Sequence, residues 1–128
     1  MRIVALIARV LLGLVFLIFG LNDFFHWFRI APAPPVGEQF LTILVSTHYI
    51  YPVKALETVS AILLLVNRYV PLAVAILAPI LVNIVLFHLL MSPSALPAIA
   101  VFVLLWAILF WRNWRYFRSL TTVRTGDI

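Results

Sequence analysis

Four side chains that can transfer protons or bind metal ions stand in stretches that are otherwise apolar: Asp23, His26, Glu57 and His88. Carboxylates and imidazoles act as proton donors and acceptors, and they are also oxygen and nitrogen ligands for divalent metals. Ionisable groups are costly within apolar spans, so they indicate a functional site. The four form no compact motif such as H-E-x-x-H, so a metal held by them is the weaker alternative.

Spacing along the chain predicts which polar groups meet. Lys54 and Glu57 are three residues apart and share one face of a helix, so Lys54 is the predicted partner of Glu57. Asp23 and His26 are also three apart, and Asn22 and His26 are four apart. Each of these pairs is predicted to lie on a single helix face.

Asn83 and His88 interrupt the apolar stretch "VNIVLFHLLM", but they do not share a face. Five residues of helix separate them by about 140°, so both could take part in one site only if the helix is kinked at Pro79 or if the site is wide enough to touch two faces. His88 is the better candidate for proton chemistry. Asn83 is the better candidate for holding Glu57 or a neighbouring helix.

Composition indicates a membrane protein. Of the 128 residues, 66% are hydrophobic and 10% are charged, far from the balance of a soluble domain. The net charge of +5 comes from basic residues that lie largely at the ends of apolar runs, without a basic stripe, so no nucleic acid partner is expected. Cysteine is absent, which excludes disulfides, thiolate metal ligands and covalent c-type haem attachment.

Four apolar runs are long enough to cross about 30 Å of hydrocarbon as helices, although the second and fourth are short. They predict an all-α membrane protein with one integral-membrane domain, a four-transmembrane-helix antiparallel bundle. Arg9 interrupts the first run and no cleavage site follows closely, so this run is predicted to be a retained span. The predicted segments are about 3–25, 52–66, 70–91 and 95–111, with an outer loop at 26–51 and a basic tail at 112–128.

The loop 26–51 has two predicted parts. Pro32, Pro34, Pro35 and Gly37 are expected to prevent regular structure in the first part. The following stretch "EQFLTILVST" has amphipathic spacing and predicts a short interfacial helix.

The arginines predict the orientation. Arg2, Arg68 and the arginines of the tail fall on one side of a four-span chain, whereas Arg29 falls on the other. Because cytoplasmic segments carry the excess of positive charge, both termini are predicted to be cytoplasmic and the proline-rich loop to face outward.

Counting depth at 1.5 Å per residue places the polar groups in one layer of the outer leaflet. Glu57 and Asn83 fall about 8 and 10 Å below the outer boundary. Arg9 lies near the inner boundary and is expected to extend to the cytoplasmic headgroups. The layer suits a quinone or lipid-like molecule, with Glu57 and His88 as proton-handling groups. The candidate ligand-binding residues are Asn22, Asp23, His26, Lys54 and Asn83.

The stretches "ARVLLGLVFLIFGLNDFFHWF", "APAPP" and "KALETVSAILLLVNRYVPLAVAILAPILVNIVLFHLL" closely resemble the DoxX family of small bacterial membrane proteins with four helices. The likeness covers about residues 7–91, whereas the fourth helix and the tail match only in character. It falls on residues that overlap with most of those chosen by depth: Asn22, His26, Glu57, Arg68, Pro71, Pro79, Asn83 and His88.

The resemblance implies a multi-pass protein of the bacterial cytoplasmic (inner) membrane. The family is named after a subunit of a thiosulfate:quinone oxidoreductase, and other members are linked to oxidative-stress complexes or to the assembly of partner proteins. Two hypotheses follow: a redox-associated subunit that binds quinone, and a non-catalytic assembly or scaffold protein whose polar layer is structural. Whether the chain is an enzyme stays open, as does its association with a membrane or periplasmic protein or with further copies of itself.

Overall fold

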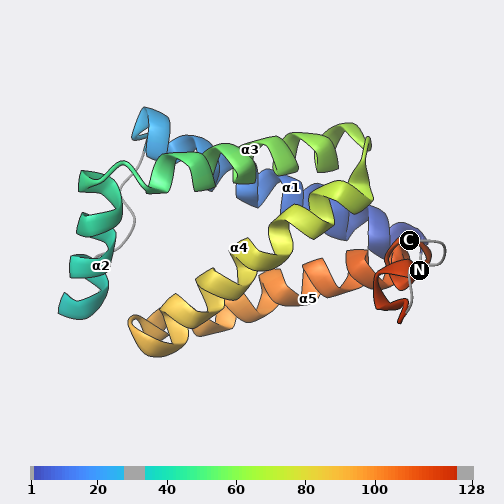
Figure 1. Cartoon of the computed structure of the whole chain (residues 1–128). Helices are drawn as coiled ribbons and strands as arrows, with labels where there is room; N and C mark the ends of the chain where they lie inside the picture. Colours follow the sequence, from blue (N-terminus) through green and yellow to red (C-terminus); the bar gives the residue numbers. More distant parts are fainter. Residues whose placement is uncertain (1, 28–33, 124–128) are drawn as a thin grey trace.

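The computed structural model describes residues 2–27 and 34–123, and within these residues every regular element is a helix (Figure 1). The predicted loop and tail therefore fall partly outside the described residues. Arg29 and Pro32 lie outside them. The longer helices are α1 (Arg2–Phe25), α2 (Pro35–Ser46), α3 (Ile50–Val66), α4 (Val70–Leu90) and α5 (Leu96–Arg112). The short helices are η1 (Pro93–Ala95), α6 (Trp114–Phe117) and η2 (Arg118–Thr121).

Four of the helices form an antiparallel bundle, in which each packs against two neighbours in the order α1, α3, α4, α5 and back to α1. The start of α1 and the end of α5 lie at one end of the bundle, together with the α3–α4 turn (Figure 1). We call this the hairpin end. At the opposite end, α2 lies across the bundle, and we call this the α2 end. The prediction of an all-α four-helix arrangement is confirmed.

The helices are apolar enough to cross a membrane. Arg2–Phe25, Val70–Leu90 and Pro93–Arg112 qualify separately, and α2 with α3 qualify as a pair that bends by 89°. Since α3 runs beside α1 in Figure 1 while α2 turns away, α3 is the part of this pair that lies among the other spans. Its 17 residues reach only about 26 Å.

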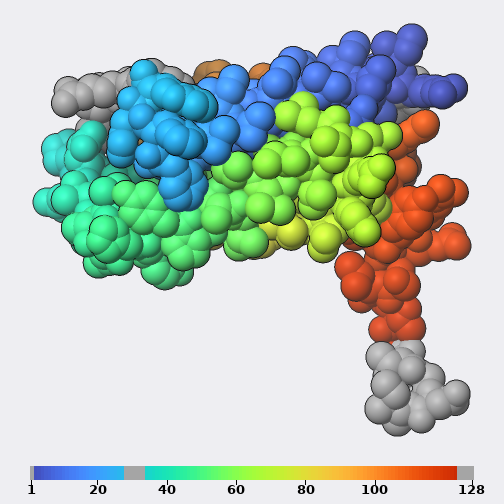
Figure 2. Space-filling view, turned by 90° about the horizontal axis from the view of Figure 1, so that it is seen from above, coloured from blue at the N-terminus to red at the C-terminus, as the bar shows by residue number. Residues whose placement is uncertain are grey.

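The apolar core lies in the half of the bundle nearer the hairpin end. Each spanning helix contributes one leucine with an exposed fraction of 2% or less: Leu12, Leu64, Leu77 and Leu109. Phe117 of α6 packs against the same cluster. The segment that follows α5 projects from the bundle, as the red atoms in Figure 2 show.

The closest packing is between α1 and α3, and glycines make it possible. A Cβ added at Gly13 would lie 2.9 Å from the side chain of Leu65. At Gly20 it would lie 2.5 Å from Thr58 Oγ1, whose hydroxyl donates to the Lys54 carbonyl at 2.8 Å. Gly13 and Gly20 therefore lie on the face of α1 that packs against α3.

We expect Gly20→Val to destabilise the protein by about 1–3 kcal/mol, because the new side chain would force α1 away from α3. The free energy of unfolding, measured by denaturing-detergent titration, checks this. Ala107→Val, which enlarges an exposed small residue of α5, is the control and should change it little. Equal stability of Gly20→Val and the wild-type protein would show that the helices do not need this close approach.

The α3–α4 turn consists of residues 67–69 and reverses the chain sharply. Asn67 and Tyr69 have left-handed backbone angles, with φ of 57° and 54°. The Arg68 N–H donates to the Leu63 carbonyl at 3.1 Å, which closes the end of α3. Pro71 lies in the first turn of α4, where its missing N–H leaves no bond unmade.

Arg9 was predicted to extend to the headgroups, but its side chain contacts α3. Its guanidinium donates to the Leu64 carbonyl, and also to the Leu65 carbonyl at 3.4 Å. The last carbonyls of a helix lack partners within the helix and carry partial negative charge, so they attract a guanidinium from the adjacent helix. Arg9 therefore links α1 to the end of α3.

We expect Arg9→Met to lower stability by about 1.5–3 kcal/mol through loss of this charged hydrogen bond. Arg2→Met, which removes an exposed arginine from the same helix, is the matched control. Thermal unfolding in a fixed detergent distinguishes them. A similar small decrease for both variants would indicate that Arg9 acts only through its charge near the membrane surface.

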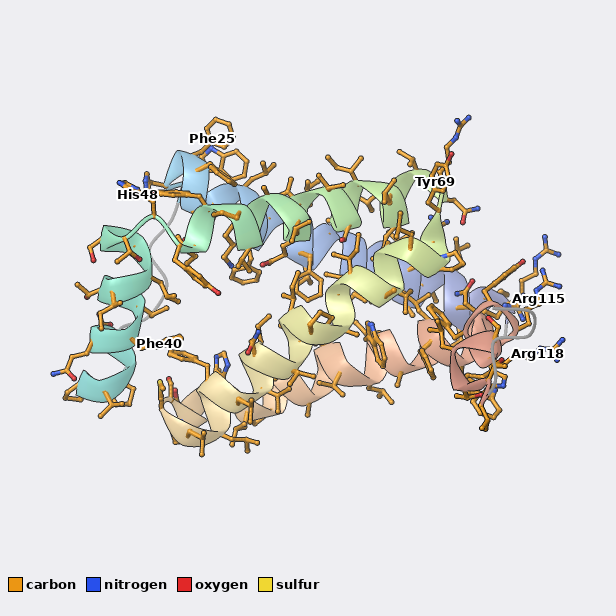
Figure 3. The ribbon with its side chains drawn as sticks, in the orientation of Figure 1. Phe25, Phe40, His48, Tyr69, Arg115 and Arg118 are labelled. Carbon is orange, nitrogen blue, oxygen red and sulfur yellow. The ribbon has the colours of Figure 1, made fainter. Side chains whose placement is uncertain are left out.

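α2 corrects the prediction that Pro35 and Gly37 prevent regular structure, because the helix begins at Pro35. Proline is favoured in a first helical turn, where its missing N–H is not needed. In α2, the ring of Phe40 lies 5.7 Å from the ring of Phe87 on α4, measured between centroids (Figure 3). His48, with φ of 61°, lies in the sharp bend that joins α2 to α3.

Candidate functional site

An ion cluster joins α1 and α3 near the α2 end. The ammonium nitrogen of Lys54 lies 3.2 Å from Asp23 Oδ2 and 3.2 Å from Glu57 Oε2. Asp23 comes from the last turn of α1, whereas Lys54 and Glu57 come from successive turns of α3. The close α1–α3 packing places Asp23 within reach of Lys54.

The cluster is partly buried and unequally charged. The side chain of Glu57 is 2% exposed, compared with 19% for Lys54 and 26% for Asp23. With all three groups ionised, one ammonium faces two carboxylates, which leaves one negative charge uncompensated within the cluster. The cluster can therefore accept one proton, or a hydrogen bond from the hydroxyl group of a ligand.

The predicted Lys54–Glu57 pair is present, but Asp23 has a different partner from the one its spacing indicated. His26 was expected on the same helix face as Asp23 and Asn22. The structure ends α1 at Phe25 and places His26 beyond it with φ of 54°, exposed at the surface. The His26 N–H donates to the Asn22 carbonyl at 2.7 Å. The side chain of Asn22 is buried in the last turns of α1.

Sequence reasoning did not single out Ser60. It is fully buried one turn after Glu57 on α3, and its hydroxyl makes no hydrogen bond within the described residues. The spacing of three from Glu57 was the available signal. Ser60 extends the polar face of α3 towards the middle of the span.

His88, near the end of α4, has a defined tautomer. Its Nδ1 lies 2.7 Å from the Ile84 carbonyl oxygen. Because a carbonyl can only accept, Nδ1 carries the hydrogen, and Nε2 of the neutral ring is left as an acceptor. Nε2 forms no hydrogen bond elsewhere in the described part of the chain. His88 can therefore accept a proton or a hydrogen bond at Nε2.

An aromatic ring packs against His88. The Phe87 ring meets the imidazole edge to face, with centroids 5.1 Å apart and planes at 86°. Phe87 also contacts Phe40, so a row of three rings runs from α2 to His88. Neither phenylalanine was selected as a candidate from the sequence, because a single aromatic residue in an apolar run has no distinguishing pattern.

The structure does not link every predicted member of the layer. Asn83 is exposed on α4. Within residues 2–27 and 34–123, no hydrogen bond or ion pair joins Asn83 or His88 to the ion cluster. In the same residues, Asp23, His26, Glu57 and His88 do not form a group of three that could hold a metal ion.

These features define a small multi-pass helical membrane protein with a partly buried ion cluster at one end of its bundle. The DoxX family model matches residues 4–90, which is more than half of the chain, and the chain belongs to the DoxX family. The match includes α1 to α4 and all the candidate residues, whereas α5 lies beyond it. No curated protein and no solved structure matches the chain.

Proposed function

We propose that this DoxX protein binds a quinone or a similarly shaped lipid-like molecule at the α2 end, as a redox-associated membrane subunit. The observation that carries the proposal is the free Nε2 of His88, whose ring contacts Phe87, with the Phe40 ring on α2 next to Phe87. A quinol hydroxyl is a hydrogen-bond donor on a flat apolar ring, so it matches an acceptor bordered by aromatic side chains.

Proton handling is assigned to His88 and Glu57. Reducing a quinone to a quinol adds two electrons and two protons, and the electrons would come from a redox partner protein. His88 can exchange a proton at Nε2, and the ion cluster can hold one proton beside Lys54. Asn22, Asp23, His26 and Lys54 are the accompanying ligand-binding candidates, whereas Asn83, which was predicted with them from the sequence, is exposed on the outside of α4.

The test is mass spectrometry of lipids and quinones retained by protein extracted directly into native nanodiscs. We expect quinone with the wild-type protein and about ten-fold less with His88→Ala, the change that corresponds to one lost hydrogen bond. Leu89→Ala, which shortens an exposed neighbour on the same helix, is the control. Wild-type quinone content in the Glu57→Gln, His88→Ala double variant would refute the proposal.

The second candidate is a non-catalytic assembly or scaffold protein of the membrane. It is favoured by the ion pairs of Lys54, which join α1 to α3 and so give the cluster a structural use. The partner-binding surface would be α2, whose exposed side chains include Val36, Phe40 and Ile43. This function predicts a co-purifying protein that is lost when Val36 and Ile43 are changed to serine. If cells in which the loop 26–51 is replaced grow as well as wild-type cells, that result would count against this function.

The proposed location is the bacterial cytoplasmic membrane, with both termini inside and α2 outside. Arg2, Arg68 and Arg112 all lie at the hairpin end, which supports this orientation. Arg115 and Arg118 project from the same end in Figure 3. A reporter fused after Ile128 should be active in the cytoplasm, and activity only on the outer side would reverse the orientation.

A further inference from the structure

Asn83 differs from every other outward-facing residue in the interior of the spanning helices. Between the terminal turns of α1, α3, α4 and α5, the exposed positions are otherwise apolar throughout the described chain. Asn83 is exposed, and no hydrogen bond to its carboxamide forms within residues 2–27 and 34–123. It lies about 10 Å along the helix from the end of α4, within the hydrocarbon region.

A carboxamide in this position needs a partner. It carries two N–H donors and an acceptor oxygen, and lipid chains offer neither donors nor acceptors. The apolar residues exposed elsewhere on the spanning helices lose no hydrogen bond by facing lipid. Asn83 alone among them requires a polar group from outside the chain.

The surface around Asn83 has the form of a helix-pairing seam. One face of α4 carries exposed residues at spacings of seven, four, three and four: Leu72, Pro79, Asn83, Leu86 and Leu90. This repeat forms a straight stripe that a second helix can follow at a small crossing angle. Ala75 and Pro79 are short side chains that allow the two helices to come close.

We propose that a second copy of this chain packs along this stripe of α4, with the two Asn83 carboxamides hydrogen-bonded to each other. All copies are inserted in the same orientation, so a two-fold axis perpendicular to the membrane brings each α4 residue to its own counterpart. Asn83 would therefore meet Asn83 at equal depth. A carboxamide is self-complementary, because it donates and accepts at once.

Single-cysteine cross-linking tests the interface, since the natural chain contains no cysteine. Leu72→Cys and Leu86→Cys lie on the stripe, while Val101→Cys on α5 and Ile18→Cys on α1 are exposed controls on other faces. In oxidised native membranes, we expect the two stripe variants to form disulfide-linked dimers and the controls to remain monomeric. Equal cross-linking on all faces, no cross-linking on the stripe, or a product containing a different protein would overturn the proposal.

The role of Asn83 is tested in the Leu86→Cys background. Asn83→Leu should weaken dimerisation about five-fold, whereas Asn83→Gln should retain it, because glutamine keeps the carboxamide. Correct folding of each variant is checked by its retention of the monomer thermal transition in detergent, and glutamine is the informative variant if leucine prevents folding. Undiminished dimer with leucine, or loss of dimer with glutamine, would remove the carboxamide from the interface. Quinone content is measured separately and does not enter either readout.

Discussion

Replacing Lys54 with methionine is expected to produce the largest loss of stability of any single change in the ion cluster, about 3 kcal/mol or more. Lys54 is the one cation within 4.0 Å of Asp23 and Glu57 in the described chain. Its removal would leave two carboxylates in a low-dielectric site without compensation. Methionine preserves most of the length and apolar area of the lysine side chain, so the loss reports the ammonium group.

The rescue variant makes this prediction specific. Combining Lys54→Met with Asp23→Asn and Glu57→Gln removes all the charges together, and we expect most of the lost stability to return. Unfolding free energies of the single and triple variants, measured in the same detergent, give the comparison. A triple variant as unstable as Lys54→Met would mean that the lysine acts through packing.

The spans could be predicted from the sequence because each depends only on local hydropathy. An apolar run of sufficient length identifies a membrane helix, and the breaks at residues 67–69 and 92–95 are marked by turn residues and proline. The start of α2 was misjudged because Pro35 reads as a helix breaker until the first turn of a helix is located. Proline disrupts the interior of a helix but is favoured in its first turn.

The site could be predicted only in part, because some of its contacts join residues that are close in the sequence and others join residues that are far apart in it. The Lys54–Glu57 pair follows from helical spacing, which is visible in the sequence. The Lys54–Asp23 pair depends on the register between α1 and α3, which is set by the contact of Gly20 with Thr58. Likewise, the bond from Arg9 to the Leu64 carbonyl joins residues 55 positions apart. A backbone acceptor leaves no trace in the residue types, so this contact required the structure.

The two halves of the bundle are held together by different forces. Near the hairpin end, the four buried leucines stabilise the packing by excluding lipid and filling the interior. Near the α2 end, the ion cluster joins α1 to α3 directly. The α4–α5 pair lacks an ion pair within the described residues, so its connection depends on packing and on uncharged hydrogen bonds.

Trp106 provides such a bond, from α5 to α4. Its indole N–H donates to the Val74 carbonyl at 2.9 Å, and its ring stacks on Phe110 with centroids 5.1 Å apart. The ring also packs against the buried core cluster. Trp106 is therefore partly enclosed by the bundle, whereas Trp111 in the same helix is exposed.

We therefore expect Trp106→Ala to destabilise the bundle by about 3–5 kcal/mol, through loss of both the packed ring and the hydrogen bond. Trp106→Phe keeps most of the ring and should cost only about 1 kcal/mol, the net value of one hydrogen bond. Trp111→Ala, an exposed tryptophan one turn and a half later in α5, is the control and should change stability little. Denaturing-detergent titration of the three variants separates these contributions. If Trp106→Ala and Trp111→Ala were equally mild, α5 would be held by its remaining contacts with α1 and the core, and Trp106 would have no special part in joining it to α4.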